Sequence, residues 1–137
     1  MKITICGSMS FAKEMLDAEK KLKGLGHNVF MPDGCEKYAQ GNIKEGGDEG
    51  AKRKIENDLI RKHYNLISES EAILVLNHEK RGIKNYIGGN AFLEMGFAHI
   101  LDKKIFLLNP APETDFMAQE IQAMRPVVLG GDLNKIL

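Results

Sequence analysis

The chain has 137 residues, equal numbers of acidic and basic side chains and a formal net charge of zero. A chain of this length predicts one domain, residues 1–137, with a hydrophobic core of its own. The neutral charge and the absence of a basic run argue against a nucleic-acid polymer or an anionic membrane surface as partner. We therefore expect the chain to act on a small molecule or to bind another protein.

The two cysteines, Cys6 and Cys35, do not have the spacing of a metal or redox motif. No group of His, Cys, Asp and Glu residues has the spacing of a metal site either, so we expect no metal and no cofactor. No apolar run approaches the roughly 18 residues of a membrane helix, and Met1 leads directly into a strand pattern without a signal peptide. These features predict a cytoplasmic protein with reduced thiols.

The first part of the chain alternates between strand and helix patterns. A β-branched strand over residues 2–6 stops at the Gly7-Ser8 turn, and Ser8 or Ser10 is placed to cap a helix over residues 11–25. A second strand is expected over residues 27–31. Residues 33–50 are rich in glycine and lack periodicity, which predicts a long loop, either a lid or a flexible surface insertion.

The second part begins with a long helix expected over residues 51–69, whose inner face would carry Ile55, Leu59, Ile60, His63, Leu66 and Ile67. The unbroken apolar run over 72–77 is typical of a central parallel strand. Further elements are a helix over 90–101, a strand over 105–108, a helix over 116–124, a strand over 127–129 and a final turn over 132–137. This alternation predicts an α/β fold: a flavodoxin-like or Rossmann-like three-layer sandwich with a five-stranded parallel sheet in the order 2-1-3-4-5.

A ligand crevice is expected at the carboxyl ends of the first and third strands, where the strand order reverses. Small and polar residues collect there in the sequence, and a Gly/Asn-rich loop enters the helix over 90–101 from the same edge. The candidate substrate-binding residues are Gly7, Ser8, Ser10, His63, Asn77, Tyr86, Gly88, Gly89 and Asn90. A plain strand-to-helix turn at Gly7, a core histidine at His63 and a solvent-facing loop at Tyr86 are the alternatives. Neither a dinucleotide fingerprint nor a P-loop is present.

Glu94 is the single carboxylate in a helix that is apolar nearly all round. The positions three and four residues away offer no Lys or Arg to pair with it. Burial of an unpaired carboxylate costs several kcal/mol, roughly, or shifts its pKa. Glu94 is therefore satisfied by backbone N–H groups, partly exposed at the edge of a turn, or turned toward a cleft as nucleophile, general base or acceptor for sugar hydroxyls.

Three segments together resemble the nucleoside 2-deoxyribosyltransferase superfamily, which includes the 2'-deoxynucleoside 5'-monophosphate N-glycosidases. They are K-I-T-I-C-G-S, A-I-L-V-L-N and Y-I-G-G-N-A-F-L-E-M-G-F-A-H-I-L-D-K-K-I-F-L-L. Residues 94–98 look like the E-x-G-x-A helix that carries the nucleophile of that family. The resemblance implies that Glu94 attacks the anomeric carbon of a nucleoside or nucleoside 5'-monophosphate and releases the base, after which water or a second base takes the sugar.

The resemblance also implies a homo-oligomer whose neighbouring subunit completes the active site. The sequence departs from the family in three places. Gly88, Gly89 and Asn90 stand where transferases carry an aspartate, Asn77 replaces an acid at the end of the third strand, and the first turn has no Arg to hold a phosphate. Lys80, Arg81 and Lys84, in the loop after the third strand, are the candidates to replace this Arg. A nucleotide-binding module without catalysis, and an oligomeric interaction domain without a small ligand, are the alternative functions.

Overall fold

A five-stranded parallel sheet forms the centre of the computed structural model, which describes residues 1–43 and 46–136. The strands are β1 (Lys2–Gly7), β2 (Asn28–Phe30), β3 (Ala72–Leu76), β4 (Lys104–Leu107) and β5 (Val127–Val128). Their order is β2-β1-β3-β4-β5, which confirms the predicted fold class and topology. All five residues of β3 are buried, as the apolar run predicts for a strand covered on both faces.

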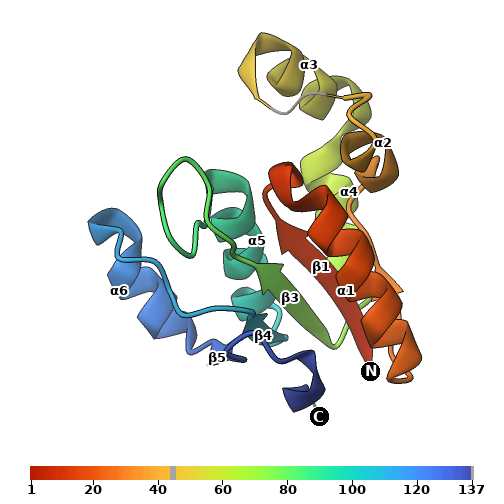
Figure 1. The fold of residues 1–137 in the computed structure, drawn as a ribbon. Coiled ribbons are helices and arrows are strands. Elements are labelled where there is room, and N and C mark those ends of the chain that lie inside the picture. Colours follow the sequence, from red (N-terminus) through yellow and green to blue (C-terminus); the bar gives the residue numbers. More distant parts are fainter. Residues whose placement is uncertain (44–45, 137) are drawn as a thin grey trace.

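Helices cover both faces of the sheet and complete three layers (Figure 1). On one side lie α1 (Ala12–Gly24), which follows the 3-10 turn η1 (Met9–Phe11), and η2 (Leu133–Lys135). On the other side lie α4 (Leu59–Ser68), α5 (Gly89–Ile100) and α6 (Asp115–Met124). Successive side chains of β3 alternate between the two cores, because strand side chains point to opposite faces: Leu74 packs with α1, and Val75 packs with α5.

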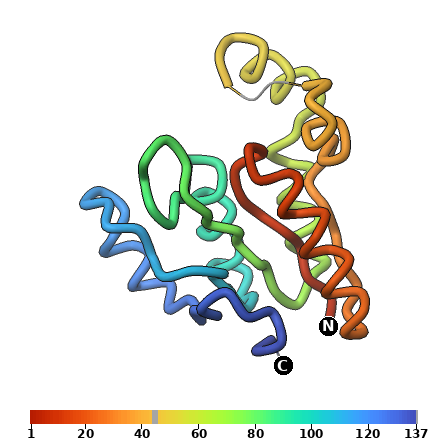
Figure 2. The backbone as a smooth tube through the Cα atoms, viewed as in Figure 1, coloured from red at the N-terminus to blue at the C-terminus, as the bar shows by residue number. Residues whose placement is uncertain are grey.

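Two short helices, α2 (Cys35–Ala39) and α3 (Gly47–Asn57), stand beyond the carboxyl ends of the strands (Figure 1). Both lie within or overlap the range that the sequence predicted to be a loop, of which residues 44–45 are outside the described part. The connection between β3 and α5 lies at the same end of the molecule, as the green loop in Figure 2 shows. These segments place the candidate site at the edge where the crevice was expected.

The single helix predicted over residues 51–69 is wrong, because the chain changes direction at Asp58. This residue has a left-handed backbone with φ of 49° and separates α3 from α4. Aspartate adopts this conformation more readily than most residues, and the Arg61 guanidinium donates a hydrogen bond to its carboxylate. The predicted inner face fails at Ile55, whose exposed fraction is 80%, whereas His63 and Ile67 are buried as expected.

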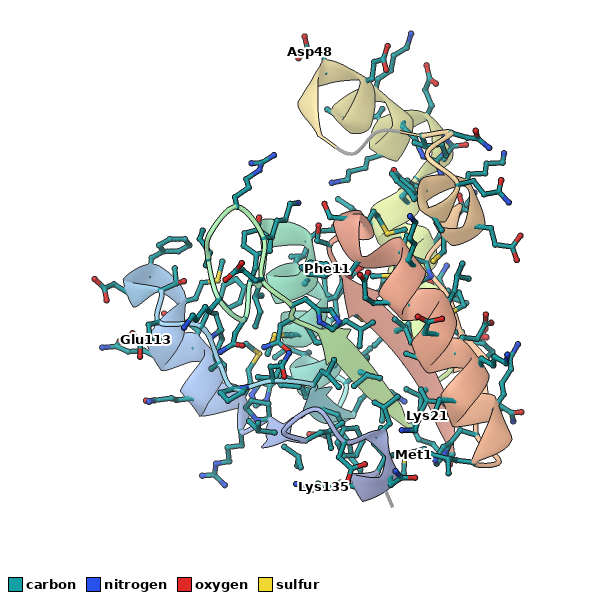
Figure 3. All side chains as sticks on the ribbon, in the orientation of Figure 1. Met1, Phe11, Lys21, Asp48, Glu113 and Lys135 are labelled. Carbon is teal, nitrogen blue, oxygen red and sulfur yellow. The ribbon has the colours of Figure 1, made fainter. Side chains whose placement is uncertain are left out.

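Met1 and Lys135 lie together at the amino-terminal side of the sheet. Figure 3 shows both residues at the opposite end of the molecule from Asp48 in α3. Met1 and Lys135 are therefore remote from the carboxyl edge that carries the candidate site. None of the helices in residues 1–43 and 46–136 has the length and apolar character that crossing a bilayer requires.

Candidate functional site

A pocket of about 350 Å³ lies between the carboxyl edge of the sheet and the two short helices above it. Its walls come from η1, the end of β2, α2, α3, α4 and the first turns of α5. The lining residues are Met9, Met31, Pro32, Asp33, Tyr38, Lys54, Leu59, Ile60, Lys62, His63, Asn65, Leu66, Asn90 and Glu94. Apolar side chains and a few convergent polar groups are the usual composition of a small-molecule site.

Glu94 lies in this pocket and forms a buried cluster with His63 and Cys6. The Oε2 atom of Glu94 is 3.5 Å from the Nε2 atom of His63, and the same Nε2 atom is 3.4 Å from the Sγ atom of Cys6. Glu94 is only 5% exposed, so the alternative of a partly exposed glutamate at the edge of a turn is wrong. The three side chains come from β1, α4 and α5, which pack against one another.

Burial sets the protonation of this cluster. It raises the pKa of Glu94 to about 8, while a hydrogen bond with the Cys6 thiol and the positive charge of Lys54 act in the opposite direction. It lowers the pKa of His63 to about 4, against a backbone hydrogen bond with Ile5. Burial and the nearby Glu94 also raise the pKa of Cys6 well above its usual value. At neutral pH the contact between His63 and Glu94 is therefore not an ion pair, and Cys6 is a poor thiolate nucleophile.

Of the predicted site residues, His63, Asn90 and Glu94 line the pocket together. Asn90 lies one helical turn before Glu94, so α5 presents both to the same space. The sequence did not predict Asp33, Tyr38 or Lys54 as lining residues, nor Cys6 beside His63 and Glu94. Asp33 and Tyr38 lie within residues 33–50, which the sequence predicted to be a lid or a surface insertion. No individual side chain of this range was predicted to contact a ligand.

Asn77 does not line the pocket, and its side chain instead binds the backbone of residues 109–110. Its Nδ2 atom donates to the carbonyl oxygens of Asn109 at 2.9 Å and Pro110 at 3.0 Å, and its Oδ1 atom accepts from the Asn109 backbone N–H at 2.9 Å. The Asn109 side chain donates in return to the Asn77 carbonyl oxygen. These bonds join the chain segments that follow β3 and β4.

A second group of predicted residues gathers around Lys80 at the same edge. The Nζ atom of Lys80 donates to the Ser8 hydroxyl at 2.8 Å and lies 5.1 Å from the centre of the Tyr86 ring. The Tyr86 ring packs on Gly88, where an added Cβ atom would lie 3.0 Å from the phenol oxygen. The Ser10 backbone N–H donates to the Ser8 hydroxyl. None of these residues is among those that line the Glu94 pocket.

Gly7 and Gly89 have different surroundings. At Gly7, with φ of 149°, a Cβ atom would lie 2.8 Å from the Leu76 carbonyl oxygen, so the close approach of β1 to β3 requires glycine there. Gly89 is the first residue of α5, and a Cβ atom at this position would meet no atom within 4 Å among the described residues. Gly7 therefore shapes the edge of the sheet through its backbone.

The sequence spacing gave no sign of a metal site, but the fold brings three possible ligands together. One ligand atom each from Cys6, His63 and Glu94 lies within 4.8 Å of the others. Because these residues belong to three elements that are far apart in the sequence, they form no short motif that the sequence alone could reveal. The predicted absence of a metal stays a prediction.

No protein-family model and no curated protein sequence matches this chain. Among the solved structures that resemble it are two enzymes. The 2-deoxyribosyltransferase of Bacillus psychrosaccharolyticus matches with a TM-score of 0.56 and 20% identity, over 83% of this chain and 76% of the enzyme. The CMP N-glycosidase BcmB of Clostridium botulinum matches with a TM-score of 0.53 and 14% identity, over 93% of this chain and 85% of the enzyme. The predicted resemblance is therefore confirmed at the level of the fold, which this chain shares with these two enzymes.

Proposed function

We propose that this chain cleaves or transfers at the N-glycosidic bond of a nucleoside or nucleoside 5'-monophosphate, with Glu94 as the nucleophile. The observation that carries the proposal is the position of Glu94, the one buried carboxylate among the described residues, in the wall of a ligand-sized pocket. The fold shared with a deoxyribosyltransferase and an N-glycosidase supports the class of chemistry.

In the proposed reaction Glu94 acts in its ionised form, which its raised pKa of about 8 makes more abundant as the pH rises. An oxygen of this carboxylate forms a bond to the anomeric carbon of the sugar. The bond from that carbon to the base nitrogen breaks, its electron pair leaves with the base, and the base takes up a proton. The sugar is then held on Glu94 as an ester. Attack by water releases a free sugar and regenerates the carboxylate, whereas attack by a second base gives a new nucleoside.

The pocket wall opposite α5 is suited to the base. Met31, Pro32 and Tyr38 provide apolar and aromatic surface for a flat ring, and Asp33 adds the second carboxylate of the lining. Arg53 pairs with Asp33 at 3.6 Å and its guanidinium lies 5.7 Å from the centre of the Tyr38 ring. We assign Asp33 to the edge of the base. There it would handle the proton that the base takes up, which is the role that the resemblance gives to the aspartate missing from the loop before Glu94.

A 5'-phosphate would be held by the group around Lys80. The Lys80 ammonium and the Ser8 hydroxyl are 2.8 Å apart at the start of η1, a pair that offers one charged and one neutral donor to phosphate oxygens. This edge belongs to the same end of the sheet as the Glu94 pocket. Monophosphates are accordingly the preferred substrates in this proposal.

A second copy of the chain is the proposed partner. Apolar side chains on the outer faces of the adjacent helices α4 and α5 remain exposed, four residues apart on α4 and seven residues apart on α5: Ile60, Tyr64, Leu93 and Ile100. The Tyr64 ring meets the ring of Phe97 edge to face, at 5.2 Å between centres, which joins the two helices in one surface. Because Ile60 also lines the pocket, a subunit on this surface would reach the edge of the site.

The test is chromatographic detection of free base from a panel of ribonucleosides, deoxyribonucleosides and their monophosphates, with and without a second base as acceptor. Wild type is compared with Glu94→Gln and with Glu120→Gln, an exposed glutamate on α6 as the control. We expect release by wild type and Glu120→Gln, and a loss of about 10³-fold or more in Glu94→Gln. Full activity of Glu94→Gln would refute the proposal. Silence across the panel, together with thermal stabilisation by nucleotides, would indicate a binding module without catalysis.

A further inference from the structure

Cys6, His63 and Glu94 bring three metal-ligating atoms together on the inner side of the pocket. The thiol sulfur, a ring nitrogen and a carboxylate oxygen all lie within 4.8 Å of one another. All three side chains are buried, and each sits on a different packed element, β1, α4 or α5. The arrangement is therefore fixed by the fold before any ion arrives, which lowers the cost of assembling a site.

The separations suit a tetrahedral ion. Bonds of about 2.0–2.3 Å from zinc to nitrogen, oxygen and sulfur place neighbouring ligand atoms about 3.3–3.8 Å apart. The distance from Cys6 Sγ to His63 Nε2 is 3.4 Å, and that from His63 Nε2 to Glu94 Oε2 is 3.5 Å. The Cys6 sulfur and the Glu94 oxygen lie within 4.8 Å of each other, so they need to approach by at most about 1.5 Å.

The donor types select the kind of ion. Thiolate, imidazole and carboxylate are the three ligand classes that zinc uses, whereas calcium and magnesium require oxygen ligands. Three protein ligands leave a fourth position, and His63 and Glu94 both face the pocket. The fourth position is thus open to water, and the pocket is the route by which an ion enters.

We propose that Cys6, His63 and Glu94 bind a zinc-like divalent cation, and that this ion reversibly blocks the carboxylate of Glu94. Binding requires the Cys6 thiolate and the Glu94 carboxylate, so the protons of the Cys6 thiol and of the protonated fraction of Glu94 pass to solvent. The blockade rests on the proposed function, because an oxygen that coordinates an ion is withdrawn from attack on a sugar carbon. The binding of the ion does not rest on it.

Cobalt(II), which absorbs light where zinc does not, is the probe. Chelator-treated full-length protein is titrated with Co²⁺, and we expect a thiolate-to-cobalt charge-transfer band with tetrahedral visible bands, both lost when Zn²⁺ is added. Cys6→Ser should lose the charge-transfer band and bind at least about tenfold more weakly. Cys35→Ser is the matched control, because Cys35 is also buried but contacts the Ala12 carbonyl oxygen and the Met15 sulfur. Its spectrum should equal that of wild type.

Absence of the charge-transfer band in wild type, its persistence in Cys6→Ser or its loss in Cys35→Ser would overturn the site. Glu94→Gln gives a second readout if Cys6→Ser does not fold. It should keep the charge-transfer band while the visible bands change, because only the oxygen ligand is altered. Unchanged visible bands in Glu94→Gln would exclude Glu94 as a ligand.

The blockade is measured separately, as release of free base from the best substrate of the panel. Added Zn²⁺ should abolish release, and a chelator should restore it. A cobalt spectrum as expected, with turnover that Zn²⁺ leaves unchanged or increases, would overturn the blockade alone. Absence of turnover in the metal-free protein would contradict the proposed function and the blockade with it, whereas the cobalt spectrum still decides the cation site.

Discussion

The Nε2 atom of His63 lies 3.5 Å from the Oε2 atom of Glu94, and both side chains are almost completely buried. The Cys6 thiol and the charge of Lys54 also act on Glu94. We expect the buried His63 ring to help hold the carboxyl group in place in the pocket wall. The His63 ring thus lies between Cys6 of β1 and Glu94, the proposed nucleophile. Its removal tests how far the position of Glu94 matters.

Substitution of His63 by alanine should lower kcat about 10²-fold with a smaller change in KM, because a reacting group displaced by about 1 Å loses that order of rate. Steady-state kinetics on the best substrate measure both constants. His63→Gln, which keeps a polar group, should recover part of kcat. Asn65→Ala on the same helix also alters the pocket lining and serves as the control. A wild-type kcat in His63→Ala would contradict the positioning role.

Lys80→Ala should raise KM for nucleoside monophosphates about tenfold or more and leave the corresponding nucleosides unaffected. The reason is the loss of a charge-assisted hydrogen bond to phosphate, worth about 1.5–3 kcal/mol. Kinetics with matched pairs of nucleoside and monophosphate give the answer. Lys84→Ala, an exposed lysine in the same loop, controls for a general loss of positive charge. Equal effects on both substrate types would show that Lys80 does not hold the phosphate.

Asn77→Ala should lower the free energy of unfolding by about 2–4 kcal/mol, because it leaves the Asn109 N–H and two carbonyl oxygens without their partner. Urea denaturation measures the change. KM of the folded variant should stay near that of wild type, since Asn77 does not line the pocket. A large rise in KM without loss of stability would instead restore the substrate-binding role that the sequence predicted.

Gly7→Ala should destabilise the fold by about 1–3 kcal/mol, because its Cβ atom would meet the Leu76 carbonyl oxygen at 2.8 Å and its φ of 149° strains an alanine. Gly24→Ala is the control. Gly24 ends α1, and a Cβ atom there would meet no atom within 4 Å among the described residues. Urea denaturation of both variants should show a loss of stability for Gly7→Ala only.

Ile100→Ser should weaken self-association, since Ile100 is 81% exposed on the α4–α5 surface proposed for a second copy. Light scattering behind size-exclusion chromatography gives the mass as a function of concentration. Phe116→Ser is the matched control, because Phe116 is 75% exposed but lies on α6. A monomeric wild type, or equal dissociation in both variants, would refute this surface as the interface.

The sheet order could be predicted from the sequence because each strand is a short apolar or β-branched run followed by a turn, and alternation with helices allows few connections. The break at Asp58 could not, because residues 51–69 have an acceptable helical pattern throughout. Only the left-handed backbone of Asp58 separates the two helices. Local pattern does not record such a choice, which depends on what α3 packs against.

The candidate site was predictable where one helix carries it. Asn90 and Glu94 lie one turn apart, so their common direction follows from the sequence alone. The sequence left open whether His63 is a core residue or a site residue. In the structure it is buried and also lines the pocket beside Glu94. The sequence spacing gave Cys6 no metal or redox role, since its neighbours His63 and Glu94 belong to helices distant in the sequence. Contacts across elements require the packing of the whole domain.

The helices α2 and α3 contribute little to the buried apolar core, whereas the sheet forms its centre. They supply Tyr38 and Lys54 to the pocket, yet Cys35 is their one member in the buried apolar core of the described residues. Glu94 and His63 stand instead on helices anchored to the sheet. Under the proposed function, selection for a new base can therefore act on α2 and α3 while the carboxylate of Glu94 keeps its support, so that substrate range and reaction chemistry can evolve separately in this fold.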